Sequence, residues 1–215
     1  IDKNTVTWAD NYDNTEQYPT VFPSMGYYNI VNGTLGIGVA LASSIPQFNL
    51  CEVNTALIKL LNNPSVDFDE IYCRPDFATG GTLINADEVK ESLRVGRGSA
   101  CKLRAKMEYN EKEHCLVVTE IPYGTYTDNI CAQMAKLLDE EPNCGIEKFV
   151  DRTKTSPNIK IFLTKRANIN QVVKLLYSKT DLQSYYSVNM TMLDNGTTPR
   201  VFGWKEALEA HLHHE

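Results

Sequence analysis

The run Asn32-Gly33-Thr34-Leu35-Gly36-Ile37-Gly38-Val39-Ala40 is the stretch around which the rest of this chain is interpreted. Glycine adopts positive φ and has no side chain, so backbone with three glycines in six residues can approach another surface closely. Ile37 stands between two of these glycines. It is therefore either a core residue of a tight turn or an apolar wedge that the chain offers to a partner.

The same glycines do not form a nucleotide-binding loop. Their order, Gly33-x-x-Gly36-x-Gly38, differs from Gly-x-Gly-x-x-Gly, and no Gly-Lys-Ser/Thr sequence follows. The surrounding pattern also lacks a preceding strand with a following βαβ unit. We therefore expect neither ATP nor NAD to bind at this loop.

Length and composition indicate an ordinary globular protein of one domain or two small ones, with 215 residues. No apolar run is long enough to span a bilayer. The six cysteines are scattered without a Cys-x-x-Cys pair, which favours reduced thiols and a cytoplasmic protein. The start, Ile1-Asp2-Lys3-Asn4, is neither an initiator methionine nor a signal peptide, so we expect a piece of a longer chain.

The first half predicts a connector and two helices. Residues 1–31 are rich in Tyr, Asn, Asp and Pro, which indicates an extended connector packed on a neighbour. Asn49 and Glu52 form a capping box for a helix that Asn62-Asn63-Pro64 ends. Leu50, Val53, Leu57, Leu60 and Leu61 give this helix its apolar spacing. A second helix is predicted from Ala86 to Val95, ending at Gly96.

The second half predicts an α+β fold with a mostly antiparallel sheet covered by helices, in the order β-β-α-β-β-α-β from about residue 100. The expected strands are Ala100–Tyr109, His114–Ile121, Ile146–Asp151, Asn158–Thr164 and Tyr185–Leu193. One helix is expected at Thr127–Glu140, and a capping box of Asn168 and Gln171 opens another. The order repeats a ββα unit, and a last helix begins at Trp204.

One segment concentrates positive charge in a chain whose net charge is −6. It contains Arg94, Arg97, Lys102, Arg104 and Lys106, with no acidic residue between them. Because the chain is not basic all round, any nucleic acid must bind through a local patch such as this one. Lys102, Arg104 and Lys106 share one face of the predicted strand, although a solvated sheet face would give the same pattern. The turn residues Arg97 and Ser99 are the favoured phosphate contacts, because glycines flank Arg97.

Two groups of carboxylates have the composition of a metal site. They are Asp10, Asp13 and Glu16, and Asp67, Asp69 and Glu70. Paired carboxylates can bind Mg²⁺, but neither group has a supporting His, Lys or glycine turn. We interpret both as solvated loops and predict no metal site.

Short motifs along the whole chain resemble, in order, the A subunit of bacterial type IIA DNA topoisomerases, gyrase and topoisomerase IV. Residues 32–37 are similar to the signature loop of that family, and residues 10–16 to its Asn-Tyr-Asp-Gly-Thr-Glu segment. The other matches are Ile45-Pro46, Pro75-Asp76-Phe77, Gly96-Arg97-Gly98, Glu120-Ile121-Pro122-Tyr123 and Leu176-Tyr177-Ser178-Lys179-Thr180. The sequence departs from the family at Asn14 (glycine), Gly38 (alanine) and Gln47-Phe48 (Pro-His).

The resemblance implies an arrangement of domains and a set of DNA contacts. Residues 1–31 would be the tail of the winged-helix domain, and residues 32–215 the tower domain. Within the tower, residues 32–99 would hold the glycine loop and helices, 100–200 the sheet unit, and 201–215 the start of a truncated helix. Ile37 falls on the intercalating isoleucine of the family, which bends DNA. The other expected DNA contacts are Asn32, Thr34, Arg94, Arg97, Ser99, Lys102 and Arg104.

The resemblance also implies ATP-dependent double-strand passage by an A₂B₂ assembly, with ATP and Mg²⁺ held by the B subunit as partner. Family members cleave DNA with a tyrosine that follows an arginine, and none of the seven arginines here precedes a tyrosine. We therefore predict a DNA-binding and DNA-bending chain that supports the gate segment but does not cut DNA alone. The alternative is a non-enzymatic protein-interaction domain, which the net charge of −6 and the many tyrosines favour. Gyrase and topoisomerase IV are not separated by these motifs.

Overall fold

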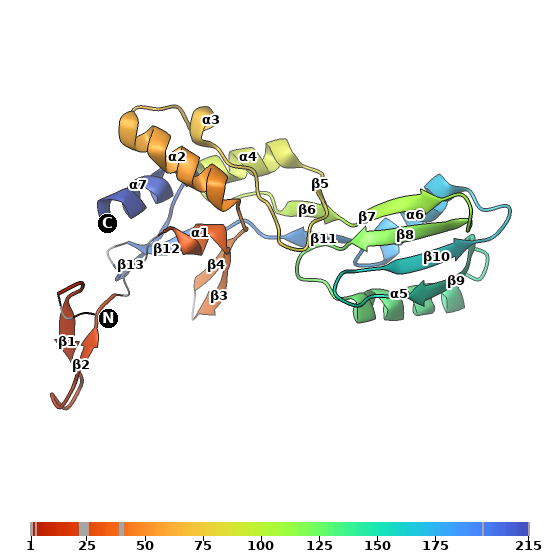
Figure 1. Cartoon of the computed structure of the whole chain (residues 1–215), viewed down its shortest axis with the longest axis horizontal. Coiled ribbons are helices and arrows are strands. Elements are labelled where there is room, and N and C mark those ends of the chain that lie inside the picture. Colours follow the sequence, from red (N-terminus) through yellow and green to blue (C-terminus); the bar gives the residue numbers. More distant parts are fainter. Residues whose placement is uncertain (1, 3, 22–25, 39–40, 195, 215) are drawn as a thin grey trace.

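The computed structural model describes residues 2, 4–21, 26–38, 41–194 and 196–214. Its elements form an elongated arrangement, with a small hairpin at one end, a helical part in the middle and a lobe built on one sheet at the other (Figure 1). The fold is α+β with antiparallel sheets, as predicted. No helix in the described ranges is long and apolar enough to cross a membrane.

The N-terminal hairpin pairs β1 (Trp8–Asp10) with β2 (Gln17–Pro19). Asn14 closes its turn with a φ of 57°, so this asparagine adopts a left-handed conformation, which glycine and asparagine tolerate best. The expected connector therefore contains a short hairpin, which stands away from the middle part in Figure 1.

The middle part combines helices, two hairpins and a three-stranded sheet. Its helices are α1 (Tyr28–Val31), α2 (Leu50–Asn62), α3 (Phe68–Ile71), α4 (Ala86–Val95) and α7 (Trp204–His214). Its hairpins are β3 (Thr34–Gly38) with β4 (Leu41–Ile45), and β12 (Thr191–Asp194) with β13 (Thr198–Val201). The sheet has the order β11-β6-β5, from β5 (Thr82–Leu83), β6 (Cys101–Arg104) and β11 (Gln183–Tyr186).

The lobe at the other end contains the predicted ββα repeat. Its strands β7 (Lys106–Asn110), β8 (Cys115–Glu120), β9 (Ile146–Asp151) and β10 (Ile159–Leu163) form one antiparallel sheet in the order β7-β8-β10-β9. Helices α5 (Thr127–Glu140) and α6 (Ile169–Lys179) follow its second and fourth strands in the chain. The apolar residues of both helices, including Met134 and Leu176, share a core with the sheet residues Val118 and Ile161.

The local signals placed the predicted helices correctly, whereas the short helices α1 and α3 were not predicted. The Asn49 side chain accepts a hydrogen bond from the Cys51 amide, and that of Asn168 accepts one from the Gln171 amide. Gly96 ends α4 with a φ of 83°. On α2, however, Leu50 and Leu61 were predicted on the apolar face and are 44% and 63% exposed. They lie at the edges of the stripe that Val53, Leu57 and Leu60 bury.

Two predicted strands were wrong in extent, because each divides between two sheets. Residues 101–104 belong to the middle sheet and residues 106–110 to the lobe, and the run 185–193 likewise divides into β11 and β12. The first break falls at Ala105, which is 2% exposed and whose amide donates a 2.7 Å hydrogen bond to the carbonyl oxygen of Leu182. This hydrogen bond thus holds Ala105 at the point where the chain passes from the middle sheet to the lobe sheet.

The buried residues form two clusters. One joins the helices of the middle part around Trp204, which is fully buried and donates its indole N–H to the Ile71 carbonyl oxygen at 2.8 Å. The other lies between the four-stranded sheet and its two helices. The clustered residues up to Leu103 and from Val188 onwards belong to the first cluster. Those from Ala105 to Leu182 belong to the second. The lobe of residues 105–182 therefore has a core of its own.

Candidate nucleic-acid interface

The glycine-rich run forms an antiparallel hairpin in which β3 pairs with β4. Ile37 lies opposite Ala42, and its side chain is 89% exposed. Leu35, two residues earlier on the same strand, is 74% exposed. Gly36 lies between them on the strand and therefore faces the opposite side of the hairpin, where a Cβ atom would meet nothing within 4 Å. The interpretation of Ile37 as a core residue of a turn is therefore wrong. Val39 and Ala40 lie outside the described residues.

The root of the hairpin holds Asn32 and Thr34. Gly33 turns the chain with a φ of +70°, and a Cβ there would lie 2.8 Å from the carbonyl oxygen of Ile45. The Thr34 hydroxyl donates to the carbonyl oxygen of Asn29 at 3.1 Å, while the Asn32 carbonyl oxygen accepts from Gln47 Nε2 at 3.0 Å. The two residues predicted to contact DNA thus lie at the base of the hairpin, three or more residues from Ile37. The Thr34 hydroxyl is already hydrogen-bonded within the protein.

Asn189 anchors the second strand of the hairpin to the body. Its amide and carbonyl exchange two hydrogen bonds of 2.8 Å with those of Ser44, and its side-chain amide donates to the Ala42 carbonyl oxygen at 2.7 Å. The Ser44 hydroxyl donates to the carbonyl oxygen of Ser187 at 2.7 Å. These bonds fix the orientation in which Ile37 is presented. Sequence reasoning missed Asn189, because no local pattern marks an asparagine that pairs with a strand 145 residues earlier.

Arg97 reaches the same place from α4. It forms a β-bridge with Asn189, and the adjacent Met190 amide donates to the Gly96 carbonyl oxygen at 2.7 Å. The Arg97 side chain is exposed and has no ion-pair or hydrogen-bond partner among the described residues. The structure therefore brings Arg97 next to the base of the Ile37 hairpin. Ser99 is also exposed and follows two residues later.

Arg94, by contrast, is occupied by acidic neighbours. Its guanidinium contacts Asp69 and Glu91, each at 3.2 Å, and lies 4.2 Å from the centre of the Phe68 ring. A hydrogen bond from Lys90 lowers the pKa of Asp69 and keeps this carboxylate ionised. These contacts tie α4 to α3, so Arg94 is engaged within the protein itself.

Lys102, Arg104 and Lys106 do not share one face of one strand, although they were predicted to do so. Lys102 and Arg104 lie on β6 beside β11, where Arg104 Nε donates to Gln183 Oε1 at 2.8 Å. Lys106 belongs to the lobe sheet, where it lies 3.6 Å from Glu120. The reason is the break at Ala105, which places Lys106 in a different sheet.

The replacement of Pro-His by Gln47-Phe48 has a structural consequence. Phe48 is 3% exposed and packs on Trp204 with ring centres 4.5 Å apart, so this side chain is part of the core. Gln47 accepts a hydrogen bond from the Ala78 amide at 2.9 Å as well as donating to Asn32. The pair therefore connects the hairpin root to the loop after Pro75.

Two half-buried tyrosines of the middle part, Tyr27 and Tyr72, are poor candidates for nucleophiles. Burial raises the pKa of Tyr27 and of Tyr72 to about 12, which disfavours their nucleophilic forms. Within the described part of the chain, no three His, Cys, Asp or Glu side chains come together to hold a metal ion. The surface around the Ile37 hairpin can contact a partner, and it presents apolar side chains with one unpaired arginine.

Comparison with known proteins identifies the family. The family model of the DNA gyrase/topoisomerase IV A subunit matches residues 1–215. The chain is 36% identical to the DNA gyrase A subunit of Thermotoga maritima, 37% to that of Metamycoplasma arthritidis and 34% to that of one strain of Staphylococcus epidermidis. Each match covers all of this chain and 27%, 24% and 25% of the respective relative, so the chain spans about a quarter of their length. The chain belongs to the family of DNA gyrase/topoisomerase IV A subunits.

Proposed function

We propose that this chain is a DNA-binding and DNA-bending part of the breakage-reunion subunit of a type IIA topoisomerase. The observation that carries the proposal is the 89% exposure of Ile37 on a hairpin fixed to the body through Asn189. Proteins that kink DNA insert a stiff apolar side chain between base pairs and unstack one step. Ile37 is branched at Cβ and so has few rotamers, which suits this task.

The surroundings of Ile37 fit a wedge that acts on a duplex. Leu35 extends the apolar surface along the same face of β3, and Gly36 leaves the opposite face of the strand without a side chain. Arg97 offers an unpaired cation at the base of the hairpin for a neighbouring phosphate. Bending a site of this size costs a few kcal/mol, which backbone contacts on both sides of the kink offset.

In the complete enzyme we propose that this chain supports the gate segment during ATP-dependent strand passage by an A₂B₂ assembly. ATP and Mg²⁺ would be held by the B subunit as partner. The chain would not cut DNA alone, because none of its arginines precedes a tyrosine, as the cleaving pair of the family requires. The domain assignment, with a winged-helix tail at 1–31 and a tower at 32–215, belongs to the same proposal.

The test is the bend angle of a duplex of about 30 base pairs, measured by energy transfer between dyes at its two ends. We expect the wild type to shorten the end-to-end distance and Ile37→Ala to abolish this shortening, while low-salt affinity falls by less than about tenfold. Ile58→Ala is the matched control, because Ile58 is a 59% exposed isoleucine on α2. Equal bending by the Ile37→Ala variant and the wild type would refute the wedge.

A protein-interaction domain is the second candidate, because Leu35, Ile37 and Leu41 together expose an apolar hairpin on a chain of net charge −6. The dependence of binding on salt separates the two. Phosphate contacts release counterions and give a steep slope of log affinity against log salt concentration, whereas an apolar protein contact does not.

A further inference from the structure

The turn between β7 and β8 lies at the outer end of the lobe, away from the middle part (Figure 1). The Asn110 side chain shapes it by accepting hydrogen bonds from the amides of Lys112 at 3.0 Å and Glu113 at 3.3 Å. His114 ends the turn with a φ of 48°, a left-handed conformation that few residues other than glycine adopt. Its imidazole consequently lies next to Tyr109 on β7, with the ring centres 5.9 Å apart and the rings nearly perpendicular.

Both ring nitrogens of His114 are hydrogen-bonded. Nε2 lies 3.2 Å from the carbonyl oxygen of Thr164, and Nδ1 lies 2.6 Å from Tyr109 Oη. A carbonyl oxygen only accepts, so Nε2 carries a proton. In the neutral imidazole Nδ1 is therefore the acceptor, and the Tyr109 hydroxyl donates to it. Thr164 thus fixes the tautomer in which the ring can take the proton of this phenol.

Tyr109 differs in this respect from other tyrosines of the chain. The hydroxyls of Tyr177 and Tyr186 donate to backbone carbonyl oxygens, which take no proton at neutral pH. The Tyr109 hydroxyl instead faces a base, and a third group orients that base. A nucleophile, a base within hydrogen-bond reach and a group that orients the base form the arrangement that activates side-chain hydroxyls for covalent chemistry.

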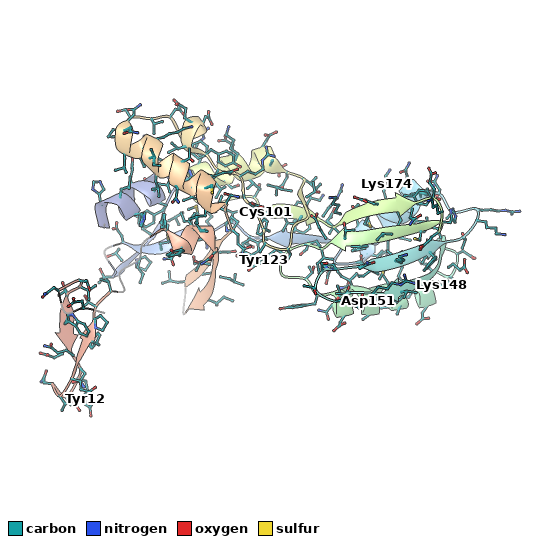
Figure 2. The ribbon with its side chains drawn as sticks, viewed as in Figure 1. Tyr12, Cys101, Tyr123, Lys148, Asp151 and Lys174 are labelled. Atoms are coloured by element: carbon teal, nitrogen blue, oxygen red, sulfur yellow. The ribbon has the colours of Figure 1, made fainter. Side chains whose placement is uncertain are left out.

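The hydroxyl group is accessible, and there is room beside its base. The Tyr109 side chain is 36% exposed. A cavity of about 330 Å³ opens at the imidazole and is lined by Glu113, His114, Glu147, Phe162, Leu163 and Lys165. Lys148 on β9, labelled in Figure 2, places its ammonium 5.1 Å from the centre of the Phe162 ring. Phe162 and Leu163 give this cavity apolar surface, which suits the uncharged chain of an acyl group.

We propose that Tyr109 is a nucleophile that accepts acyl groups from activated esters, with His114 as its base. Tyr109 Oη forms a bond to the carbonyl carbon of the ester while the phenolic proton moves to His114 Nδ1. The bond between that carbon and the leaving oxygen then breaks, and the leaving oxygen takes the proton from Nδ1. The products are an O-acyl tyrosine and an alcohol, so the step needs no oxidant or reductant. This site lies apart from the Ile37 hairpin and does not depend on DNA binding.

The test is the rate at which para-nitrophenyl acetate acetylates each tyrosine of the whole chain, resolved by mass spectrometry of its peptides. Tyr126 is the matched control, because it lies in the same lobe, is 70% exposed and has no hydrogen-bond partner among the described residues. Although Tyr109 is less exposed, we expect it to be acetylated about 100-fold faster than Tyr126. Tyr109→Phe should remove this fast acetylation.

The variant His114→Asn removes the base and keeps the turn, because asparagine tolerates the left-handed conformation. We expect acetylation of Tyr109 to slow to the rate of Tyr126 in this variant, while the rate of Tyr126 itself stays unchanged. Equal rates at the two tyrosines of the wild type would overturn the proposal without recourse to any variant. Fast acetylation of Tyr109 that persists in His114→Asn would also overturn it, because exposure alone would then account for the reactivity.

Discussion

Glu113 and Lys160 form an ion pair of 2.6 Å on the face of the lobe sheet. The Lys160 side chain is only 13% exposed, so its charge depends on this carboxylate more than a surface lysine would. The hydrogen bond from Lys160 lowers the pKa of Glu113 below its ordinary value of 4.5. This ion pair therefore links the β7–β8 turn to β10 through a contact that depends on pH.

We expect this pair to stabilise the lobe at neutral pH and to lose its effect in acid. Because the folded-state pKa of Glu113 is depressed, its contribution is present above the unfolded value near 4.5 and disappears as pH falls through the folded value. Glu113→Gln should thus be less stable than wild type in urea at pH 7, with a difference that shrinks towards pH 3. Glu111→Gln, in the same turn and without an ion pair among the described residues, is the control. A difference that does not change with pH would contradict the assignment.

The β3–β4 hairpin shows how one element is held by residues distant in sequence. Its exposed strand β3 carries the apolar side chains, while β4 is bonded to Asn189 and contributes the buried Ile45 to the core. Strand β4 thus holds the hairpin to the rest of the protein, and strand β3 is free to contact a partner. Removal of the Asn189 side chain, which is bonded to β4, tests these separate roles of the two strands.

We expect Asn189→Ala to loosen the hairpin without unfolding the protein. The substitution removes the 2.7 Å hydrogen bond to the Ala42 carbonyl oxygen but keeps both backbone bonds to Ser44, a loss of about 1 kcal/mol. Hydrogen exchange of the β3 and β4 amides should become faster, while that of α5 stays unchanged. DNA bending should fall in parallel. Faster exchange throughout the middle part would instead indicate general destabilisation.

The elements that could be predicted from sequence are those with signals inside the element. Helices α2 and α6 begin where Asn49 and Asn168 cap them, and α4 ends where Gly96 requires positive φ. The strand runs 100–109 and 185–193 were wrong in extent because alternation of side chains says nothing of which sheet a residue joins. That choice depends on partners such as Leu182, 77 residues from Ala105 along the chain.

The residues of the candidate site divide in the same way, into those with a local sequence signal and those whose contacts are with distant segments. The glycines around Ile37 left open whether this side chain is buried or exposed, and the family resemblance favoured the exposed position that the structure shows. The glycines that flank Arg97 predicted its exposure. Asn189 was missed, because its contacts join segments that are distant along the chain. Arg94 differs from Arg97, since its charge is paired with Asp69, 25 residues earlier in the chain. A basic cluster in a sequence does not reveal which of its charges are already paired.

At the scale of the whole molecule, the two hydrophobic clusters predict two unfolding units. Residues 105–182 have a core of their own, joined to the rest at the β6–β7 and α6–β11 connections and through contacts of Glu120 and Tyr123 with the middle part. We expect scanning calorimetry to show two transitions, and urea unfolding monitored by Trp8 and Trp204 fluorescence to report on only one, since the lobe contains no tryptophan. A single transition with equal calorimetric and van't Hoff enthalpies would contradict this expectation.

The register of the middle sheet has a consequence for how the lobe is built into the chain. Arg104 and Gln183 are directly paired across β6 and β11, so the two ends of the lobe leave the sheet side by side. Residues 105–182 therefore have the form of an insertion within a β-hairpin, and a two-residue Asn-Gly turn could join β6 to β11 in their place. A gene shortened in this way would encode the part that carries the β3–β4 hairpin by itself, and the excised segment would encode a separate small domain.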